Sequence, residues 1–352
     1  GPSTLPVKVL EQVQKDFVCY KSTGMSVIEM SHRSGMFLEI YNSAVTNLKT
    51  LLNIGDDYSV LFLHGGATQQ FSAVPLNMPI KSGKALYVDS GSFAAKAAKE
   101  AKKYKEVEII ASSKNDNYTY VPKFDVDSID KNADYLHITT NNTIYGTKYT
   151  SIPEISIPLV ADASSNILSE NYDISKFAAI YAGAQKNIGP SGLCVLVAKK
   201  EYIVEPMSNC PILQSWKIQD ENESMYNTPN TFGIYVANLV FENLLSIGGV
   251  TEIEKINRYK AGLLYDFIDN SSLFKGTANK EYRSLMNATF VTGDENLDKE
   301  FVSQAAKAGL VNLKGHRSVG GMRASIYNAM PVEGVEALVD FMKKFELENG
   351  GK

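Results

Sequence analysis

Residues 178–198 read AAIYAGAQKNIGPSGLCVLVA, and this stretch indicates how the chain folds. Two short apolar runs, Ala179–Tyr181 and Leu193–Ala198, predict strands on either side of a turn rich in small residues. Lys186 lies in that turn, flanked by Gly and Pro rather than by other charges. A lysine among apolar and main-chain polar groups has a destabilised ammonium form, so its amine is more available as a nucleophile. The stretch therefore predicts a reactive amine beside a buried strand pair, with a solvated surface lysine as the alternative.

The same pattern extends outward from this stretch. Further short apolar runs predict strands at Ser59–Leu63, Lys84–Val88, Val107–Ile110, Tyr135–Thr139 and Leu159–Ala161. Helical segments alternate with them, which predicts a mostly parallel sheet with helices on both faces. Two helices come first, at Leu5–Phe17 with Ser3 or Thr4 as the cap, and at Gly35–Leu52.

The pattern changes after about residue 240, where Gly248 and Gly249 separate two helical segments. Residues 289–345 mix strands and helices, as in a smaller α+β unit. We therefore expect three parts: an N-terminal segment (1–15) packed on the small domain, a large domain (16–245) and a small C-terminal domain (246–352).

The composition excludes several classes of protein. The chain has 352 residues, 44% apolar and 21% charged, which is typical of globular proteins. A net charge of -4 without a basic block argues against a nucleic-acid partner. No apolar run approaches the roughly 20 residues that cross a bilayer, and Gly1–Leu5 lacks the features of a signal peptide. Three scattered cysteines argue against a disulfide framework or a metal site. We expect a cytoplasmic protein without a membrane partner.

Polar residues follow the predicted strands at the sheet edge where open α/β sheets bind ligands. Gly65–Thr68 leads from a strand into a helix, where free N–H groups can bind a phosphate, although this signal alone is weak. Asp162, if buried, needs a cationic partner such as a protonated pyridine ring; capping the next segment is the alternative. Phe93 could stack on such a ring or belong to the core. With Lys186, these groups match pyridoxal phosphate.

Seven strings in the chain are distinctive: SHRS (31–34), HGGATQQF (64–71), NNTIYGT (141–147), ADASSNIL (161–168), YAGAQKNIGPSG (181–192), MYNTP (225–229) and GHRSVGGMRASIYNAMP (315–331). Together they resemble the phosphoserine aminotransferases, which are fold-type I, class-V enzymes dependent on pyridoxal phosphate. The resemblance covers essentially the whole chain. It implies the α/β fold of fold-type I enzymes, with a mostly parallel, seven-stranded sheet in the large domain and a smaller α+β C-terminal domain.

The resemblance also implies roles for single residues. Lys186 would be the catalytic residue and form an imine with the cofactor, Asp162 would meet the pyridine nitrogen, and Thr143 would lie by the ring hydroxyl. The implied cofactor-binding residues are Gly66, Ala67, Thr68, Phe93, Thr143, Asp162, Gln185, Lys186, Asn227 and Thr228. Of these, Asn227 and Thr228 would reach the phosphate from the second subunit of a homodimer with shared active sites.

The substrate residues stand out in the composition. The chain has only five arginines, at positions 33, 258, 283, 317 and 323. The resemblance implies that His32–Arg33 and His316–Arg317 bind a substrate phosphate and that Arg323 binds the α-carboxylate. Arginine suits both tasks because its planar fork binds oxyanions through two hydrogen bonds.

The implied reaction is the reversible transamination of 3-phosphohydroxypyruvate with glutamate, which gives O-phosphoserine and 2-oxoglutarate in serine biosynthesis. A second substrate, 4-phosphohydroxythreonine of vitamin B6 synthesis, is compatible with the same motifs. The alternatives are another class-V enzyme or a non-catalytic protein of the same fold. Two positions depart from the family: Phe93 stands where Trp is frequent, and Thr68 where some members have Arg.

Overall fold

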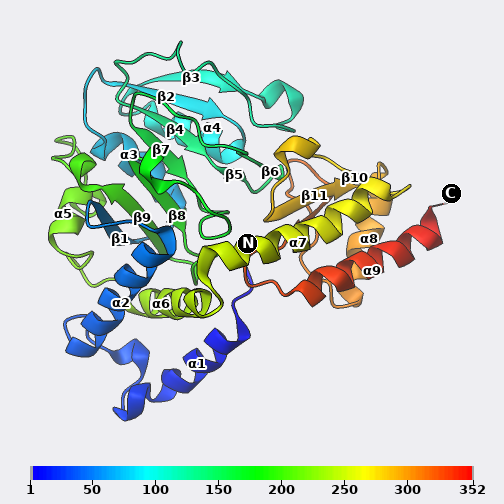
Figure 1. Cartoon of the computed structure of the whole chain (residues 1–352), viewed down its shortest axis with the longest axis horizontal. Helices are drawn as coiled ribbons and strands as arrows, with labels where there is room; N and C mark the ends of the chain where they lie inside the picture. Colours follow the sequence, from blue (N-terminus) through cyan, green and yellow to red (C-terminus); the bar gives the residue numbers. More distant parts are fainter. Residues whose placement is uncertain (1–2, 351–352) are drawn as a thin grey trace.

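The computed structural model describes residues 3–350 and is built around two sheets of very different size (Figure 1). The larger sheet, here called the large sheet, contains β1 (Tyr58–His64), β2 (Lys84–Asp89), β3 (Glu106–Ser112), β4 (Tyr135–Thr139), β7 (Leu159–Asp162), β8 (Ala179–Gly183) and β9 (Leu193–Lys199). The small sheet contains β10 (Lys275–Gly276), β11 (Asn287–Val291) and β12 (Met322–Ser325), and β5 (Asn141–Asn142) pairs with β6 (Thr147–Lys148) in a short hairpin.

The seven strands of the large sheet follow the order β1-β9-β8-β7-β4-β2-β3. The pairs from β8 to β3 are parallel, whereas β9 is antiparallel to both of its neighbours. The predicted fold class, a mostly parallel seven-stranded sheet, is therefore confirmed. One core packs α3 (Ala67–Asn77) and α4 (Ser92–Ala101) against one face, and another packs α2 (Gly35–Leu52) and α6 (Thr231–Ser246) against the other. A short helix, α5 (Trp216–Glu221), lies between β9 and α6 in the chain.

The small sheet has a core of its own. It is covered by α7 (Gly249–Asn270), α8 (Glu295–Lys307) and α9 (Val332–Asn349), and its centre is a cluster of phenylalanines that includes Phe274, Phe290, Phe301 and Phe345. In Figure 1, α7 runs from the large sheet along the small one. The domain boundaries expected from the sequence, after residues 15 and 245, stay predictions.

The N-terminal helix differs from its prediction. It is α1 (Val7–Val18), preceded by Pro6 in an extended conformation (ψ 133°) and without a side-chain cap. The predicted start at Leu5 and the cap at Ser3 or Thr4 are therefore wrong. Helix α1 packs on α6, where Phe17 and Phe232 lie edge to face with ring centroids 6.1 Å apart. Ser3 and Thr4, in contrast, line a pocket together with residues 309–314 and Met330 of the small unit. Residues 1 and 2 of the predicted segment lie outside the described part.

No described helix is long and apolar enough on its own to cross a membrane. Helices α6 and α7 together meet the criteria of length and composition, with a bend of 82° between them.

Candidate functional site

Three separate segments meet at the side chain of Lys186, which lies in the loop between β8 and β9. Its Nζ donates a hydrogen bond to Thr143 Oγ1 at 2.8 Å and lies 5.8 Å from the centre of the Phe93 ring. Burial lowers the pKa of this amine to about 8; the charge of Asp162 opposes that shift, and Arg323 adds to it. At neutral pH an appreciable fraction of the amine is therefore uncharged and nucleophilic.

Asp162 ends β7, which is separated from β9 by β8 in the large sheet. Its side chain is buried, and its Oδ1 accepts hydrogen bonds from the Ser164 N–H at 2.9 Å and from the Ser164 hydroxyl at 2.6 Å. Burial raises the pKa of this carboxyl, while Ser164 and the charge of Lys186 oppose the rise. Within residues 3–350 no group donates a hydrogen bond to Oδ2, which leaves that oxygen for a cationic donor.

The start of α3 forms an anion site of main-chain amides. Gly66 precedes the helix without a side-chain cap, and a methyl group on its Cα would meet nothing within 4 Å. A Cβ on Gly183 would lie 2.8 Å from Gln185 Oε1 and 3.5 Å from the Ala67 amide nitrogen, so those two groups converge beside the loop. Thr68, in the first turn of α3, is exposed. Free N–H groups and a helix dipole in this arrangement favour a phosphate.

Several positive charges act on His316, in the segment before β12. Arg323 on β12 donates from Nη1 to the Thr143 carbonyl at 3.3 Å, and its buried Nε has no partner among the described residues. His316 lies in the loop before β12; its pKa is lowered first by burial and then by the charges of Arg323, Arg317 and Lys96. The positive charges of Arg323, Arg317 and Lys96 thus all act on His316.

Two pairs of predicted site residues, His32–Arg33 and Asn227–Thr228, are not among the residues that surround Lys186 and His316. His32 and Arg33 lie in the loop before α2, and within residues 3–350 their side chains make no hydrogen bond or ion pair. Neither residue is among the charges that affect His316. Asn227 Nδ2 and the Thr228 carbonyl contact His64 Nε2 at 3.3 and 2.9 Å, at the end of β1. Thr228 is exposed.

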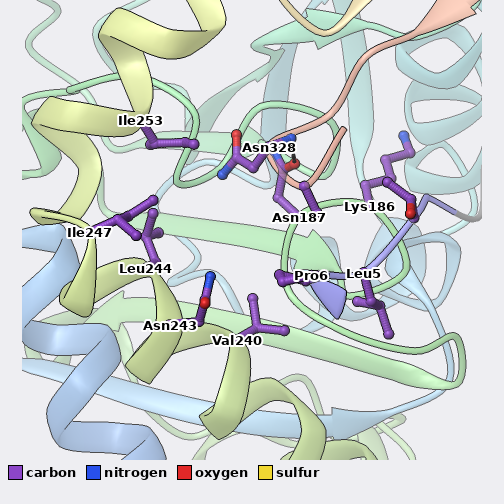
Figure 2. Close-up of a pocket in the computed structure, with 12 residues that line it drawn as sticks. Leu5, Pro6, Lys186, Asn187, Val240, Asn243, Leu244, Ile247, Ile253 and Asn328 are labelled. Carbon is purple, nitrogen blue, oxygen red and sulfur yellow. Dashed lines mark hydrogen bonds between the residues drawn. The ribbon is translucent and has the colours of Figure 1, made fainter. Parts of the chain in front are cut away.

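Lys186 also borders a pocket next to its loop. It is lined mainly by apolar side chains of the N-terminal segment and of α6 and α7, and Figure 2 shows the Lys186 amine directed away from them. The Lys186 amine therefore faces Thr143 and not this apolar pocket. Asn187 and Asn328 lie together at the boundary of this pocket (Figure 2).

Comparison with known proteins agrees with this geometry. The family model "Aminotransferase class-V" matches residues 1–338. The chain belongs to the class-V aminotransferases. Among curated proteins, it is 55% identical over 350 residues to the phosphoserine aminotransferase of Bacillus cereus, with 99% of this chain and 97% of that protein covered.

Solved structures of class-V aminotransferases have the same fold. The phosphoserine aminotransferase from Bacillus circulans subsp. alkalophilus is 44% identical and superposes with a TM-score of 0.96, over 99% of this chain and 98% of that one. The structure of a PLP-bound phosphoserine aminotransferase from Trichomonas vaginalis is 35% identical, with a TM-score of 0.92 and coverage of 97% and 98%. The predicted family, fold and enzyme class are thereby confirmed.

Several residues of this class-V site were not predicted. Ser164 orients Asp162, Tyr327 accepts a hydrogen bond from Asn287, and Lys96 adds to the positive charge that lowers the pKa of His316. Ser164 and Tyr327 lie inside strings that were recognised, so their polar character beside Asp162 and Arg323 was a usable signal. Lys96 lies in an alanine- and lysine-rich helix, where nothing distinguishes it from Lys99.

Proposed function

We propose that this chain is a phosphoserine aminotransferase that uses pyridoxal phosphate. The observation that carries the proposal is the buried Lys186 amine, held by Thr143 with Asp162 and Arg323 as the charges around it. The names of the curated and structural relatives support the same activity.

The residues present fit pyridoxal phosphate. The free Oδ2 of Asp162 suits a protonated pyridine nitrogen, the uncapped start of α3 with Gln185 suits the phosphate, and Phe93 offers a ring for stacking. Gly66, Ala67 and Thr68 would supply the amides and a hydroxyl of that phosphate site. When bound, the cofactor supplies an electron sink for the carbanion formed at the substrate Cα.

In this proposal each residue has a distinct task. Lys186 removes the proton from the substrate Cα and later returns one, as a general base and acid whose lowered pKa suits operation near neutral pH. Asp162 keeps the ring nitrogen protonated. Arg323, with an unpartnered Nε, binds the substrate α-carboxylate and so orients the Cα–H bond toward Lys186.

The cationic group beyond Arg323 supports a phosphorylated substrate. His316 and Arg317 would bind the phosphate of O-phosphoserine or 3-phosphohydroxypyruvate, and in the other half-reaction they would bind the side-chain carboxylate of glutamate. The same site would accept 4-phosphohydroxythreonine, since that substrate carries the same two anionic groups.

We further propose a cytoplasmic homodimer with shared sites. His32 and Arg33 have no partner in their own described chain, and Thr228 is exposed, so these residues are free to face a second subunit. In the dimer His32–Arg33 would complete the partner's substrate site, and Asn227–Thr228 would reach the partner's cofactor phosphate. The division at residues 15 and 245 belongs to the same proposal.

The direct test measures 2-oxoglutarate-dependent consumption of O-phosphoserine by the purified, pyridoxal phosphate-loaded protein. We expect turnover with O-phosphoserine and much weaker turnover with alanine or serine, which lack the phosphate. Efficient turnover of alanine with no preference for O-phosphoserine would indicate another class-V activity. No turnover of any amino donor, together with no borohydride-sensitive yellow colour, would indicate a non-catalytic protein.

A further inference from the structure

Lys260, in the middle of α7, is a fully buried lysine that the reaction described above does not use. Its exposed fraction is 0%, and its Nζ points into a turn of main chain that follows β12. The ammonium donates to the carbonyl oxygens of Tyr327 and Met330 at 2.9 Å each, and contacts those of Ile326 at 3.3 Å and Asn328 at 3.5 Å. Four carbonyls of one five-residue segment, 326–330, thus surround a single cation.

No carboxylate compensates this buried charge. Within the described residues Lys260 forms no ion pair, and burial is the cause that lowers its pKa, to about 8. Carbonyl oxygens accept hydrogen bonds only, so a protonated amine with three donors suits them better than a neutral one. A buried charge without a counter-charge is costly, and the four carbonyl oxygens are the groups that offset this cost for Lys260.

Segment 326–330 carries two side chains to the site. Tyr327 accepts a hydrogen bond from Asn287 Nδ2 at 3.1 Å. The side chain of Thr143, which holds the Lys186 amine, lies near the Tyr327 hydroxyl and opposes the rise in its pKa that burial causes. The Tyr327 side chain is fully buried. A displacement of the segment would therefore move the hydroxyl of Thr143 relative to Lys186.

Asn328 makes the second connection. Its N–H donates to Asn187 Oδ1 at 3.0 Å, its Nδ2 donates to the Leu168 carbonyl at 2.8 Å, and its Oδ1 accepts from Asn257 Nδ2 at 2.8 Å. Asn187 directly follows Lys186 in the chain, and Figure 2 shows Asn187 and Asn328 side by side next to the lysine. The segment thus reaches the reactive amine by two routes, through the Tyr327 side chain to Thr143 and through the Asn328 main chain to Asn187.

We propose that Lys260 is a positioning residue, a tethered internal cation that holds segment 326–330 so that Tyr327 and Asn328 fix Thr143 and Asn187 around Lys186. The inference depends on the proposed function only in taking Lys186 as the reactive amine. It adds a requirement that lies outside the site: the small-domain helix α7 sets the geometry of a loop in the large domain.

The test replaces Lys260 by Met, which has nearly the same length and no charge. We expect Lys260→Met to lower kcat about 10- to 100-fold with a smaller change in KM for O-phosphoserine, because misplacement of a reacting group affects the chemical step. A second readout is the pH titration of the cofactor absorbance in the resting holoenzyme, which reports the protonation of the nitrogen of Lys186. We expect its midpoint to shift. Lys255→Met on the exposed side of the same helix is the matched control and should change neither quantity.

A role in fold stability alone would lower the melting temperature of Lys260→Met and leave kcat and the titration midpoint as in the wild type; that result would overturn the proposal. If Lys260→Met does not fold, Asn187→Ala tests the same connection, because it removes the acceptor through which Asn328 reaches the loop of Lys186. An unchanged midpoint and kcat in Asn187→Ala would then overturn it. Absence of phosphoserine turnover in the wild-type protein would instead contradict the proposed function, whatever Lys260→Met does.

Discussion

The two ends of the site differ in how completely one chain builds them. At the cofactor end, Lys186, Asp162 and Thr143 are buried or half-buried, in the loop after β8, on β7 and in the β5–β6 hairpin, and they have hydrogen-bond partners in their own chain. At the substrate end, Arg317 is exposed in a loop, and the side chains of His32 and Arg33 make no hydrogen bond or ion pair within residues 3–350. The reactive amine thus lies in a loop between two strands of the large sheet, whereas His32–Arg33 and His316–Arg317, the pairs proposed to bind the substrate phosphate, lie in loops outside that sheet.

Among substitutions at the cofactor end of the site, Lys186→Ala should lower the activity most. We expect a loss of about 10⁴-fold in the rate of O-phosphoserine turnover, because both the nucleophile and the proton carrier are removed. The measurement is steady-state turnover together with borohydride sensitivity of the absorbance. Lys200→Ala, an exposed lysine just beyond β9, is the control and should retain full activity. Retained turnover in Lys186→Ala would remove the basis of the proposed function.

At the substrate end of the site, the corresponding substitution is Arg33→Ala. We expect it to lower kcat/KM for O-phosphoserine about 10²-fold. If Arg33 serves the partner's site, mixing this variant with inactive Lys186→Ala should restore activity, because each hybrid dimer contains one site with both residues. Equal mixing and exchange should give about a quarter of wild-type activity in a two-fold symmetric dimer. No recovery after verified subunit exchange would place Arg33 in its own subunit's site. The same experiment applies to Asn227→Ala.

A smaller effect is expected on the pKa of Lys186, on which the charges of Asp162 and Arg323 act in opposite directions. The carboxylate of Asp162 stabilises its ammonium form and Arg323 destabilises it. Asp162→Asn should therefore lower the pKa of Lys186 below about 8, and Arg323→Gln should raise it, each by about one unit.

Since the neutral amine is the nucleophile, the rate at which cofactor-free protein combines with pyridoxal phosphate should rise with pH through that pKa. The pH of half-maximal rate should then move down in Asp162→Asn and up in Arg323→Gln. Shifts in the same direction would show that a rearrangement of the loop outweighs the two charges.

The smallest expected effect concerns Lys96, a residue of α4 whose Nζ lies 5.4 Å from the Phe93 ring centre. Lys96→Glu should raise KM for O-phosphoserine a few-fold, about threefold to tenfold, more at low salt than at high salt. Lys99→Glu makes the same charge change on the same helix and is the control. Equal effects of both variants would mean that only the net charge of the helix matters.

The position of Lys186 and Asp162 in the fold is easier to predict from the sequence than the proximity of the cations near His316, for a physical reason. Asp162 ends the buried strand β7 and Lys186 lies in the loop just after β8, and strand ends are readable from apolar runs followed by turn residues. The antiparallel direction of β9 was not readable, since periodicity does not reveal the direction of a neighbour. The effect of Lys96 and Arg323 on His316 depends on how α4 and the segment around β12 pack together, which no local pattern encodes.

The start of α1 illustrates another limit. Ser3, Thr4 and Pro6 all favour helix starts, and the sequence could not tell which of them begins the helix. The structure begins it after Pro6, whose ring fixes φ and whose missing N–H costs nothing there. Lys260 is a third case: a lysine in an amphipathic helix predicts an exposed side chain, and only the fold of segment 326–330 explains its burial.

The strand order of the large sheet constrains when a newly made chain can become functional. Strand β1, which leads into the start of α3, pairs among the described strands only with β9, the last strand of that sheet to be synthesised. Until residues 193–199 have emerged, β1 has no neighbouring strand in the sheet, although α2 can already pack on one of its faces. Such long-range pairing slows folding, because the intervening loop must close before the contact forms. A ribosome-bound chain that ends before β9 is therefore expected to bind no cofactor and to be open to aggregation.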